Sequence, residues 1–261
     1  VLHIKRELAD QLLTESSKTI SELETTLDAD LKPASLDLDI VLSATTEIIQ
    51  QEVTTQNVIA LLPGTDEALN DEYIVVGAHY DHLGWGGKGS GSRRPDTTAI
   101  HNGADDNASG VAAVLEIAEK LALGKLAPKR SVLFMAFGAE EMGLLGSKFF
   151  TKNPLIDKSH IKQMFNLDMV GRLNPSKPSL TVGGTGTGLG MEAFLLDHAI
   201  DRDFQLSTTP DGYGPSDHAA FYVEDVPVLF FFTGITEEYH TPQDDLETIN
   251  ISGEKAIADY A

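Results

Sequence analysis

Apolar and polar positions along the chain fall into two repeating patterns, which predict a series of strands and helices. Continuous apolar runs are typical of strands covered on both faces, and the clearest lie at residues 73–78 and 131–137. Further strands are expected at 161–167, 180–182 and 226–232. Apolar residues with a 3.6-residue period indicate amphipathic helices. We expect one helix from Ser109 to Gly124, a second that ends at about Phe150, a third at 191–200 and a fourth from Ser216 to Tyr222. Strands alternating with helices predict an α/β fold with a mixed, mostly parallel central sheet sandwiched by helices.

The first part of the chain carries weaker signals. Residues 1–36 suggest a short strand and two helical pieces, with a capping-box pattern, Ser21 and Glu24, at the start of the second. Residues 36–50 alternate as a half-buried strand does, and we expect them to pair antiparallel with a second strand at 53–62. We therefore predict a helical N-terminal extension over 1–36 and an α/β domain over 37–261, whose last residues lie inside an unfinished helix.

Composition narrows the possible partners and ligands. The 261 residues are 41% hydrophobic, and 40 acidic against 19 basic residues give a net charge of −21. This charge disfavours nucleic acid and anionic membranes as partners. No apolar run approaches the roughly 18 residues of a membrane span, and no signal peptide is visible. Because the chain has no cysteine, any metal would be held by His, Asp and Glu.

Side chains of the metal-binding types follow the predicted strands. They are His79, Asp106, Glu140, Glu141, Asp168 and His240. Taken singly, each has a structural explanation, such as a hydrogen-bonded core histidine or a glutamate pair at a helix start. Because ligands of open α/β sheets bind beyond the carboxyl ends of the strands, their joint occurrence there predicts a metal site.

The number of these side chains indicates two metal ions. A catalytic zinc takes three protein ligands and a water, whereas this set offers two imidazoles and at least three carboxylates. Two ions about 3.5–4 Å apart, with one carboxylate bridging them, are typical of phosphatases, nucleases and aminopeptidases. We expect two Zn²⁺ ions, for which Co²⁺ or Mn²⁺ can substitute.

Five motifs between residues 79 and 241 identify a family. They are His79-x-Asp81, 103–110, Glu140-Glu141-x-Gly143, Asn166-Leu167-Asp168-Met169 and Tyr239-His240-Thr241. In this order they resemble the dinuclear zinc aminopeptidases of the bacterial leucyl aminopeptidase type, whose relatives include glutamate carboxypeptidases and glutaminyl cyclases. The resemblance implies that Asp106 bridges the ions, that His79 and Asp168 complete one position, and that Glu141 and His240 complete the other.

The resemblance also implies the roles of residues around the metals. Glu140 would be the general base, taking a proton from a metal-activated water and passing it to the leaving amine. Asp81 would hold the His79 ring in the right tautomer. Tyr239 would donate a hydrogen bond to the tetrahedral oxyanion.

Several nearby residues fit the family pattern less directly. His82 and His101 flank the motifs without matching a ligand position, and we expect structural or rim roles for them. Asp217 and His218 resemble a motif of this family whose residues contact the metal ligands and not the metals themselves. Pro215 stands close to where some aminopeptidases place an arginine that binds the substrate amino end, so recognition of that end stays open.

The motif set predicts an exopeptidase that hydrolyses N-terminal residues from peptides, with an apolar first side chain beside Met169, Tyr213 and the 230–232 strand. A carboxypeptidase would need a basic cluster, and the candidates are scattered: Arg93, Arg94 and Arg172. A glutaminyl cyclase would work with one zinc, and a metal-free binding module would have lost a ligand or Glu140.

Residues 1–36 resemble the connector that follows a protease-associated domain in longer family members. Because those members are usually secreted or periplasmic, the resemblance implies a periplasmic or extracellular location. The oligomeric state stays open.

Overall fold

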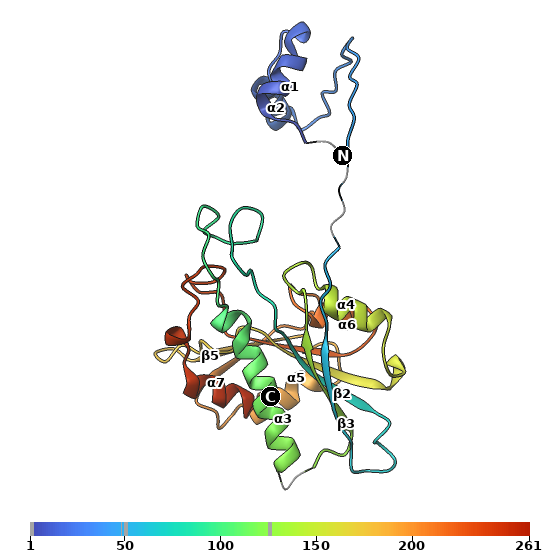
Figure 1. Cartoon of the computed structure of the whole chain (residues 1–261), viewed down its shortest axis with the longest axis vertical. Helices are drawn as coiled ribbons and strands as arrows, with labels where there is room; N and C mark the ends of the chain where they lie inside the picture. The colour runs from blue at the N-terminus through green and yellow to red at the C-terminus, as the bar shows by residue number, and fades with distance from the viewer. Residues whose placement is uncertain (1–2, 48, 50–51, 125–126) are drawn as a thin grey trace. The chain divides into compact units, whose positions relative to one another are not determined.

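The computed structural model describes residues 3–47, 49, 52–124 and 127–261 (Figure 1). They form two compact units, one ending at Val53 and one comprising Thr54–Ala261. The predicted boundary at residue 36 differs from this division, because residues 37–47 group with the first unit. In the described parts of the chain, no helix combines the length and apolar character needed to cross a bilayer.

The first unit contains the two predicted helical pieces: α1 (Arg6–Leu12), η1 (Thr14–Ser16) and α2 (Ile20–Asp30). The capping box of α2 is formed by Thr19 and Glu22, and its prediction at Ser21 and Glu24 was wrong. The Thr19 hydroxyl accepts the Glu22 amide at 3.3 Å, and the Glu22 carboxylate accepts the Thr19 amide at 2.8 Å. Both pairs have the same spacing, but the Glu24 carboxylate is held by the Arg6 guanidinium.

The strand predicted at 36–50 is absent from the described residues 36–47 and 49, while residues 48 and 50 lie outside the described set. Alternation predicts burial of the face that carries Leu36 and Leu42, yet these two side chains are 39% and 69% exposed. Residues 3–5 likewise form no strand, contrary to the prediction for the start of the chain, of which residues 1–2 are not described. A strand needs a pairing partner, and none of the described residues of this unit provides one.

The second unit is built on a mixed sheet with the strand order β1-β3-β2-β4-β7-β5-β6. Its strands are β1 (Val58–Leu62), β2 (Tyr73–His79), β3 (Ser131–Phe137), β4 (Ile161–Leu167), β5 (Ser179–Gly183), β6 (Gln205–Thr208) and β7 (Val228–Phe232). β1 pairs antiparallel with β3, and β5 pairs antiparallel with β7, while the other pairs are parallel. The predicted mixed, mostly parallel sheet is confirmed, but β1 is shorter than predicted and pairs with β3 instead of with residues 36–50.

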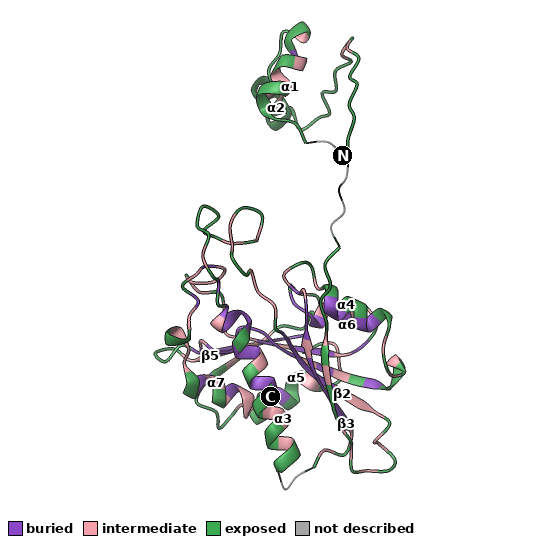
Figure 2. Ribbon diagram, viewed as in Figure 1, coloured by how far each residue is buried: buried purple, intermediate pink, exposed green. Residues whose placement is uncertain are grey.

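Helices cover both faces of this sheet. They are η2 (Ala104–Ser109), α3 (Gly110–Leu123), α4 (Leu145–Lys152), η3 (Lys158–His160), α5 (Met191–His198), α6 (His218–Tyr222), η4 (Leu246–Thr248) and α7 (Ile251–Ala258). α3, α5 and α7 pack into one apolar layer through Val114, Leu195 and Ile257. α4 and α6 pack into the other through Phe150 and Phe221. The buried residues of the sheet lie between these layers (Figure 2), as the predicted sandwich requires.

β3 shows why a central strand can be apolar along almost its whole length. Val132 and Phe134 belong to the layer under α3, whereas Leu133, Met135 and Phe137 belong to the layer under α4 and α6. Burying each such side chain contributes about 1.5–3 kcal/mol. A strand covered on both faces therefore needs apolar residues at every position, which is the pattern that the sequence has.

Two predictions about helix ends were wrong. Asp217, not Ser216, is the N-cap residue of α6, because the Ser216 hydroxyl accepts a hydrogen bond from the Asn166 side chain at 2.8 Å. α7 ends at Ala258, and the amides of Tyr260 and Ala261 both donate to the Ile257 carbonyl in a closing turn.

Candidate metal centre

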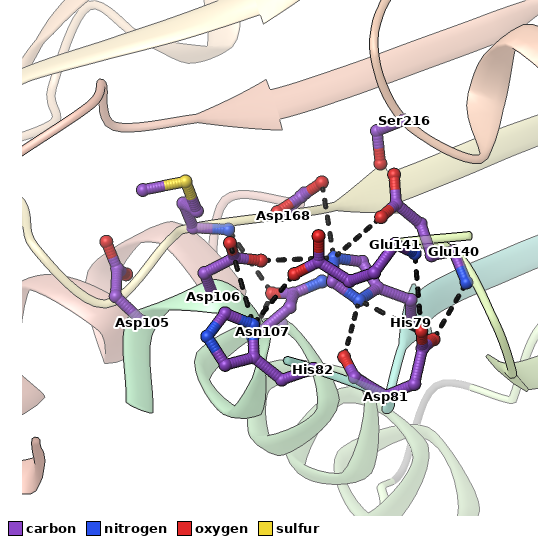
Figure 3. Close-up of polar contacts among 12 residues, drawn as sticks. His79, Asp81, His82, Asp105, Asp106, Asn107, Glu140, Glu141, Asp168 and Ser216 are labelled. Carbon is purple, nitrogen blue, oxygen red and sulfur yellow. Dashed lines mark hydrogen bonds and ion pairs between the residues drawn. The ribbon is translucent and has the colours of Figure 1, made fainter. Parts of the chain in front are cut away.

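The six predicted metal-type residues gather at the carboxyl edge of the parallel strands. His79 is the last residue of β2, Glu140 and Glu141 lie in the turn after β3, and Asp168 directly follows β4. Asp106 lies in η2 on the crossover from β2 to α3, and His240 lies in the loop after β7. Figure 3 shows the carboxylates of Asp106, Glu140, Glu141 and Asp168 converging around the His79 ring. This is the edge at which open α/β sheets bind ligands.

The buried His79 ring marks a first position. Its Nε2 lies 3.3 Å from Asp106 Oδ1, 3.6 Å from Asp168 Oδ2 and 3.9 Å from Glu140 Oε2. Its Nδ1 lies 3.0 Å from the main-chain carbonyl of Asp81. Because a carbonyl only accepts, Nδ1 carries a proton there and Nε2 is turned towards the carboxylates.

Asp81 contacts both His79 and the turn that carries Glu140 and Glu141. The sequence did not indicate this double contact. Its main-chain oxygen orients His79, while its carboxylate lies 3.9 Å from the ring. That carboxylate instead accepts the main-chain amides of Glu140 and Glu141 at 2.9 and 3.2 Å. Asp81 thus fixes the turn that carries both glutamates.

A second position lies on the other side of Asp106. His240 Nε2 is 3.1 Å from Asp106 Oδ2 and 3.3 Å from Glu141 Oε2. Its Nδ1 lies 3.1 Å from the Gly91 carbonyl, which orients the ring as the Asp81 carbonyl orients His79. Asp106 therefore offers one oxygen to each histidine, the arrangement of a bridging carboxylate.

The segment that carries Asp106 is held by hydrogen bonds from a distant loop. The Asp244 carboxylate accepts the main-chain amides of Asp105 and Asp106 at 3.0–3.1 Å. Gly103 has a φ of +62°, and a Cβ there would lie 2.3 Å from the Asp106 carbonyl. The peptide bond between Asp106 and Asn107 is cis. The two amide bonds to Asp244 and the glycine at position 103 hold this segment so that it presents the Asp106 carboxylate.

The electrostatics of the cluster are those of crowded carboxylates and imidazoles. Burial by itself raises the pKa of Asp106, but His240 and His79 hold it well below its ordinary value. Burial lowers the pKa of His240, and the carboxylates of Asp106 and Glu141 overcome this and raise it to about 10. Burial raises the pKa of Glu140 to about 8, with Asp168 and Asp217 adding to the shift.

These residues fit a divalent metal. Four carboxylates that share one largely buried space repel one another unless cations balance their charge. Among the described residues, Glu141 Oε1 and both ring nitrogens of His82 are buried without a hydrogen-bond partner. Imidazole nitrogens together with carboxylate oxygens, with no sulfur, suit Zn²⁺ and the similar ions Co²⁺ and Mn²⁺.

The three residues predicted to contact the substrate, Tyr239, Met169 and Tyr213, differ in their burial and in their neighbours. The Tyr239 ring stacks on the His240 ring with centroids 3.8 Å apart, and burial with the nearby Asp106 raises the pKa of its hydroxyl well above the ordinary value. Met169 directly follows Asp168 and is 4% exposed. Tyr213 is 64% exposed, and its ring packs edge-on against Tyr222.

The flanking histidines differ from each other. Both ring nitrogens of His101 are engaged, Nδ1 with the Ala99 carbonyl at 3.0 Å and Nε2 with the Ser92 hydroxyl at 2.8 Å, which fits the expected structural role. His82 instead lies among the metal-type residues, with Nδ1 2.8 Å from Glu141 Oε1. The sequence analysis missed this placement; the spacing His79-x-x-His82 in one strand-end loop was the available signal.

Asp217 and His218 lie close to the metal-type residues Glu140 and Asp168, at the start of α6. Burial raises the pKa of Asp217 to about 7. Burial lowers the pKa of His218 to about 4, and its ring stacks on Phe230 with centroids 4.3 Å apart. The two residues add a buried polar layer beneath Glu140 and Asp168.

A mixed α/β sheet with imidazoles and carboxylates at its carboxyl edge places this chain among the α/β proteins that can bind metal ions at the ends of their strands. Residues 57–261 match the family model of peptidase family M28, and the chain belongs to this family. The family resemblance predicted from the motifs is thereby confirmed.

Three similar proteins illustrate the relationship. The chain is 32% identical over 191 residues to leupeptin-inactivating enzyme 1 of Streptomyces exfoliatus, covering 69% of this chain and 36% of that protein. It is 31% identical over 210 residues to aminopeptidase YwaD of Bacillus subtilis, covering 76% and 41%. The structure of BSAP, a zinc aminopeptidase from Bacillus subtilis, superposes with a TM-score of 0.62 at 27% identity, covering 78% of this chain and 48% of that one. The chain thus spans less than half the length of these relatives.

Proposed function

We propose that this chain is a two-zinc exopeptidase that removes N-terminal residues from peptides. The observation that carries the proposal is the position of Asp106, whose two oxygens face His79 at 3.3 Å and His240 at 3.1 Å. Membership of family M28 and the aminopeptidase names of its relatives support the same function.

In this proposal Asp106 bridges the two ions. His79 and Asp168 complete one position, and Glu141 and His240 complete the other. Zinc bound there would supply Lewis-acid chemistry, polarising the scissile carbonyl and lowering the pKa of water towards about 7.

The chain's own residues would handle the proton and the developing charge. Glu140 lies beside the first position, with Oε2 3.9 Å from His79 Nε2, and would take the proton of the attacking water and deliver it to the amine that leaves. The Tyr239 hydroxyl would donate a hydrogen bond to the oxyanion of the tetrahedral intermediate. Its raised pKa keeps this donor protonated at neutral pH.

An aminopeptidase is favoured over a carboxypeptidase by the engagement of two of the candidate arginines. The Arg172 guanidinium lies 2.8 Å from the Glu238 carboxylate, and the Arg93 guanidinium donates to the Thr236 carbonyl at 3.3 Å. Both guanidinium groups therefore hold the loop before His240 and are partly committed to protein partners. A positively charged α-amine, in contrast, is attracted by the acidic cluster.

A substrate panel tests the function. We expect hydrolysis of aminoacyl p-nitroanilides with a free α-amine and an apolar side chain, loss of activity with a chelator, and recovery on adding Zn²⁺. N-acetylated analogues should resist hydrolysis. Release of C-terminal residues, or cyclisation of N-terminal glutamine, would contradict the proposal. The Glu140→Gln protein, purified in parallel, controls for contaminating peptidases.

We also propose a periplasmic or extracellular location, with residues 1–36 as a connector after a protease-associated domain. The support is the resemblance to longer family members alone. Fractionation of the source cells, followed by detection of the protein in each fraction, tests it; recovery with cytoplasmic markers would contradict it.

A further inference from the structure

His82 is a buried imidazole that the proposed mechanism leaves without a role. It lies three residues beyond His79 in the loop after β2, and its side chain is 8% exposed. Neither ring nitrogen has a hydrogen-bond partner among the residues that the structure describes. A buried polar group without a partner costs about 1–3 kcal/mol, so this ring is placed to meet a group beyond these side chains.

The His82 ring faces the second metal position (Figure 3). Its Nδ1 lies 2.8 Å from Glu141 Oε1 and 3.8 Å from Asp106 Oδ2. The 2.8 Å approach lacks the alignment of a hydrogen bond, and Glu141 Oε1 is itself without a partner. Two atoms that each bind one zinc ion at about 2.0–2.2 Å lie at most about 4.4 Å apart, and both distances meet this limit.

Packing holds the ring in this place. A Cβ at position 103 would lie 2.7 Å from the His82 ring, so the glycine at 103 makes room for it. On another side the ring packs edge-on against His240, with centroids 5.7 Å apart. His82 is therefore fixed beside Asp106 and Glu141 and is not free to turn outwards.

We propose that His82 Nδ1 is a further ligand of the second metal position, together with Asp106, Glu141 and His240. This inference rests on the proposed two-metal function. It makes the two positions unequal, because the second would have two imidazoles and the first only His79. The second position would then bind its ion more tightly and fill first, while the first would keep the open coordination site for substrate.

Metal titration of two variants tests this ligand role. Calorimetric titration of the metal-free wild-type protein with Co²⁺ or Zn²⁺ should show that two ions bind, one of them more tightly than the other. His82→Gln keeps an N–H that can hydrogen-bond to Glu141 but is a poor metal ligand, and His82→Ala removes both functions. We expect both variants to weaken the tighter step by more than about 100-fold, since losing a partner outside the ligand shell already costs about 10–100-fold.

The matched control is His101→Gln, which removes a neighbouring buried imidazole whose nitrogens are both engaged by protein atoms. It should titrate like the wild type. If His82→Gln also titrates like the wild type while His82→Ala is weakened, His82 only orients Glu141, and the proposal is overturned.

X-ray absorption of the zinc-loaded wild type gives a second test that does not depend on whether the variants fold. The proposal predicts three imidazole ligands shared by two ions: His79, His82 and His240. Two ions with two imidazoles would overturn this inference alone. A wild type that binds a single ion would overturn the two-metal function as well, so the two failures are distinguishable.

Discussion

Glu140 and Glu141 are adjacent residues whose carboxylates face different partners. Glu141 Oε2 lies 3.3 Å from His240, whereas Glu140 Oε2 lies 3.9 Å from His79. Both main-chain amides are held by Asp81. One turn thus presents two carboxylates to two positions, which gives each a separate role in the proposed chemistry.

Substitutions at this turn should separate the base from the ligand. Glu140→Gln keeps the shape of the side chain but cannot take a proton, so kcat should fall by at least about 10²–10⁴-fold with KM little changed and both ions retained. Glu141→Ala should lose metal as well as rate. Peptide hydrolysis and metal content are measured on both proteins. Near-normal turnover of metal-loaded Glu140→Gln would refute the assignment of Glu140 as the general base. Loss of metal from this variant would mean that Glu140 is the ligand and Glu141 the base.

His218 should make the stability of the metal-free protein depend on pH. Its folded pKa is about 4, below the ordinary value of about 6.5. Between these values the unfolded chain binds a proton that the folded chain does not, so stability is lost as the pH falls from about 6.5 to about 4. The loss is at most about 3 kcal/mol.

Urea denaturation of chelated protein at several pH values measures this effect. The wild type should lose more stability than His218→Gln between pH 7 and pH 4, because the variant lacks the titrating ring. His160→Gln, at an exposed position, should follow the wild type. Parallel pH profiles of wild type and His218→Gln would show that His218 does not titrate as described.

At the scale of elements, the site depends on the loop after β7 as much as on the strands. Asp244 accepts the main-chain amides of Asp105 and Asp106, which ties the start of η2 to the loop that carries His240. The loop rich in glycine after β2 adds a further connection, since the Gly91 carbonyl orients His240.

Removing the Asp244 carboxylate should loosen this connection. Asp244→Ala leaves two amides without their acceptor, each costing about 1–3 kcal/mol when buried, and should also weaken metal binding. The neighbouring Asp245→Ala removes only a bond to the exposed Asn102 side chain and serves as control. Denaturant unfolding of the metal-free proteins measures the difference; equal stability of both variants would contradict this account.

Much of the fold could be predicted because its central strands are buried on both faces. β2, β3 and β7 follow apolar runs, and the ends of the predicted strands located five of the ligand candidates. β6 was missed because its residues, Gln-Leu-Ser-Thr, form a short, mostly polar edge strand. Residues 36–50 alternate, but pattern alone does not supply a pairing partner.

The site was predicted less completely than the fold. The roles of single atoms, such as the Asp81 carbonyl on His79, depend on main-chain geometry that residue types do not encode. His82 was given a structural or rim role because its spacing from His79 does not by itself show that the turn after β2 brings it beside Glu141.

At the scale of the whole chain, the metal-type residues all lie in the unit that begins at Thr54. A protein shortened to residues 54–261 should therefore bind metal and hydrolyse small chromogenic substrates within a few-fold of the full chain. Metal content and turnover of the two proteins are compared at equal concentration. A folded, metal-loaded protein of this length without turnover would show that the first unit contributes to the chemistry.

The most direct test of the two-metal centre is the zinc content of the folded wild-type chain. The protein is dialysed to equilibrium against buffer that contains a saturating concentration of free Zn²⁺, and the bound zinc per chain is measured. Because the two oxygens of Asp106 face two separate histidines, we predict two zinc ions per chain. A value that stays at one under saturating zinc would contradict the bridging role of Asp106 and the two-metal function built on it.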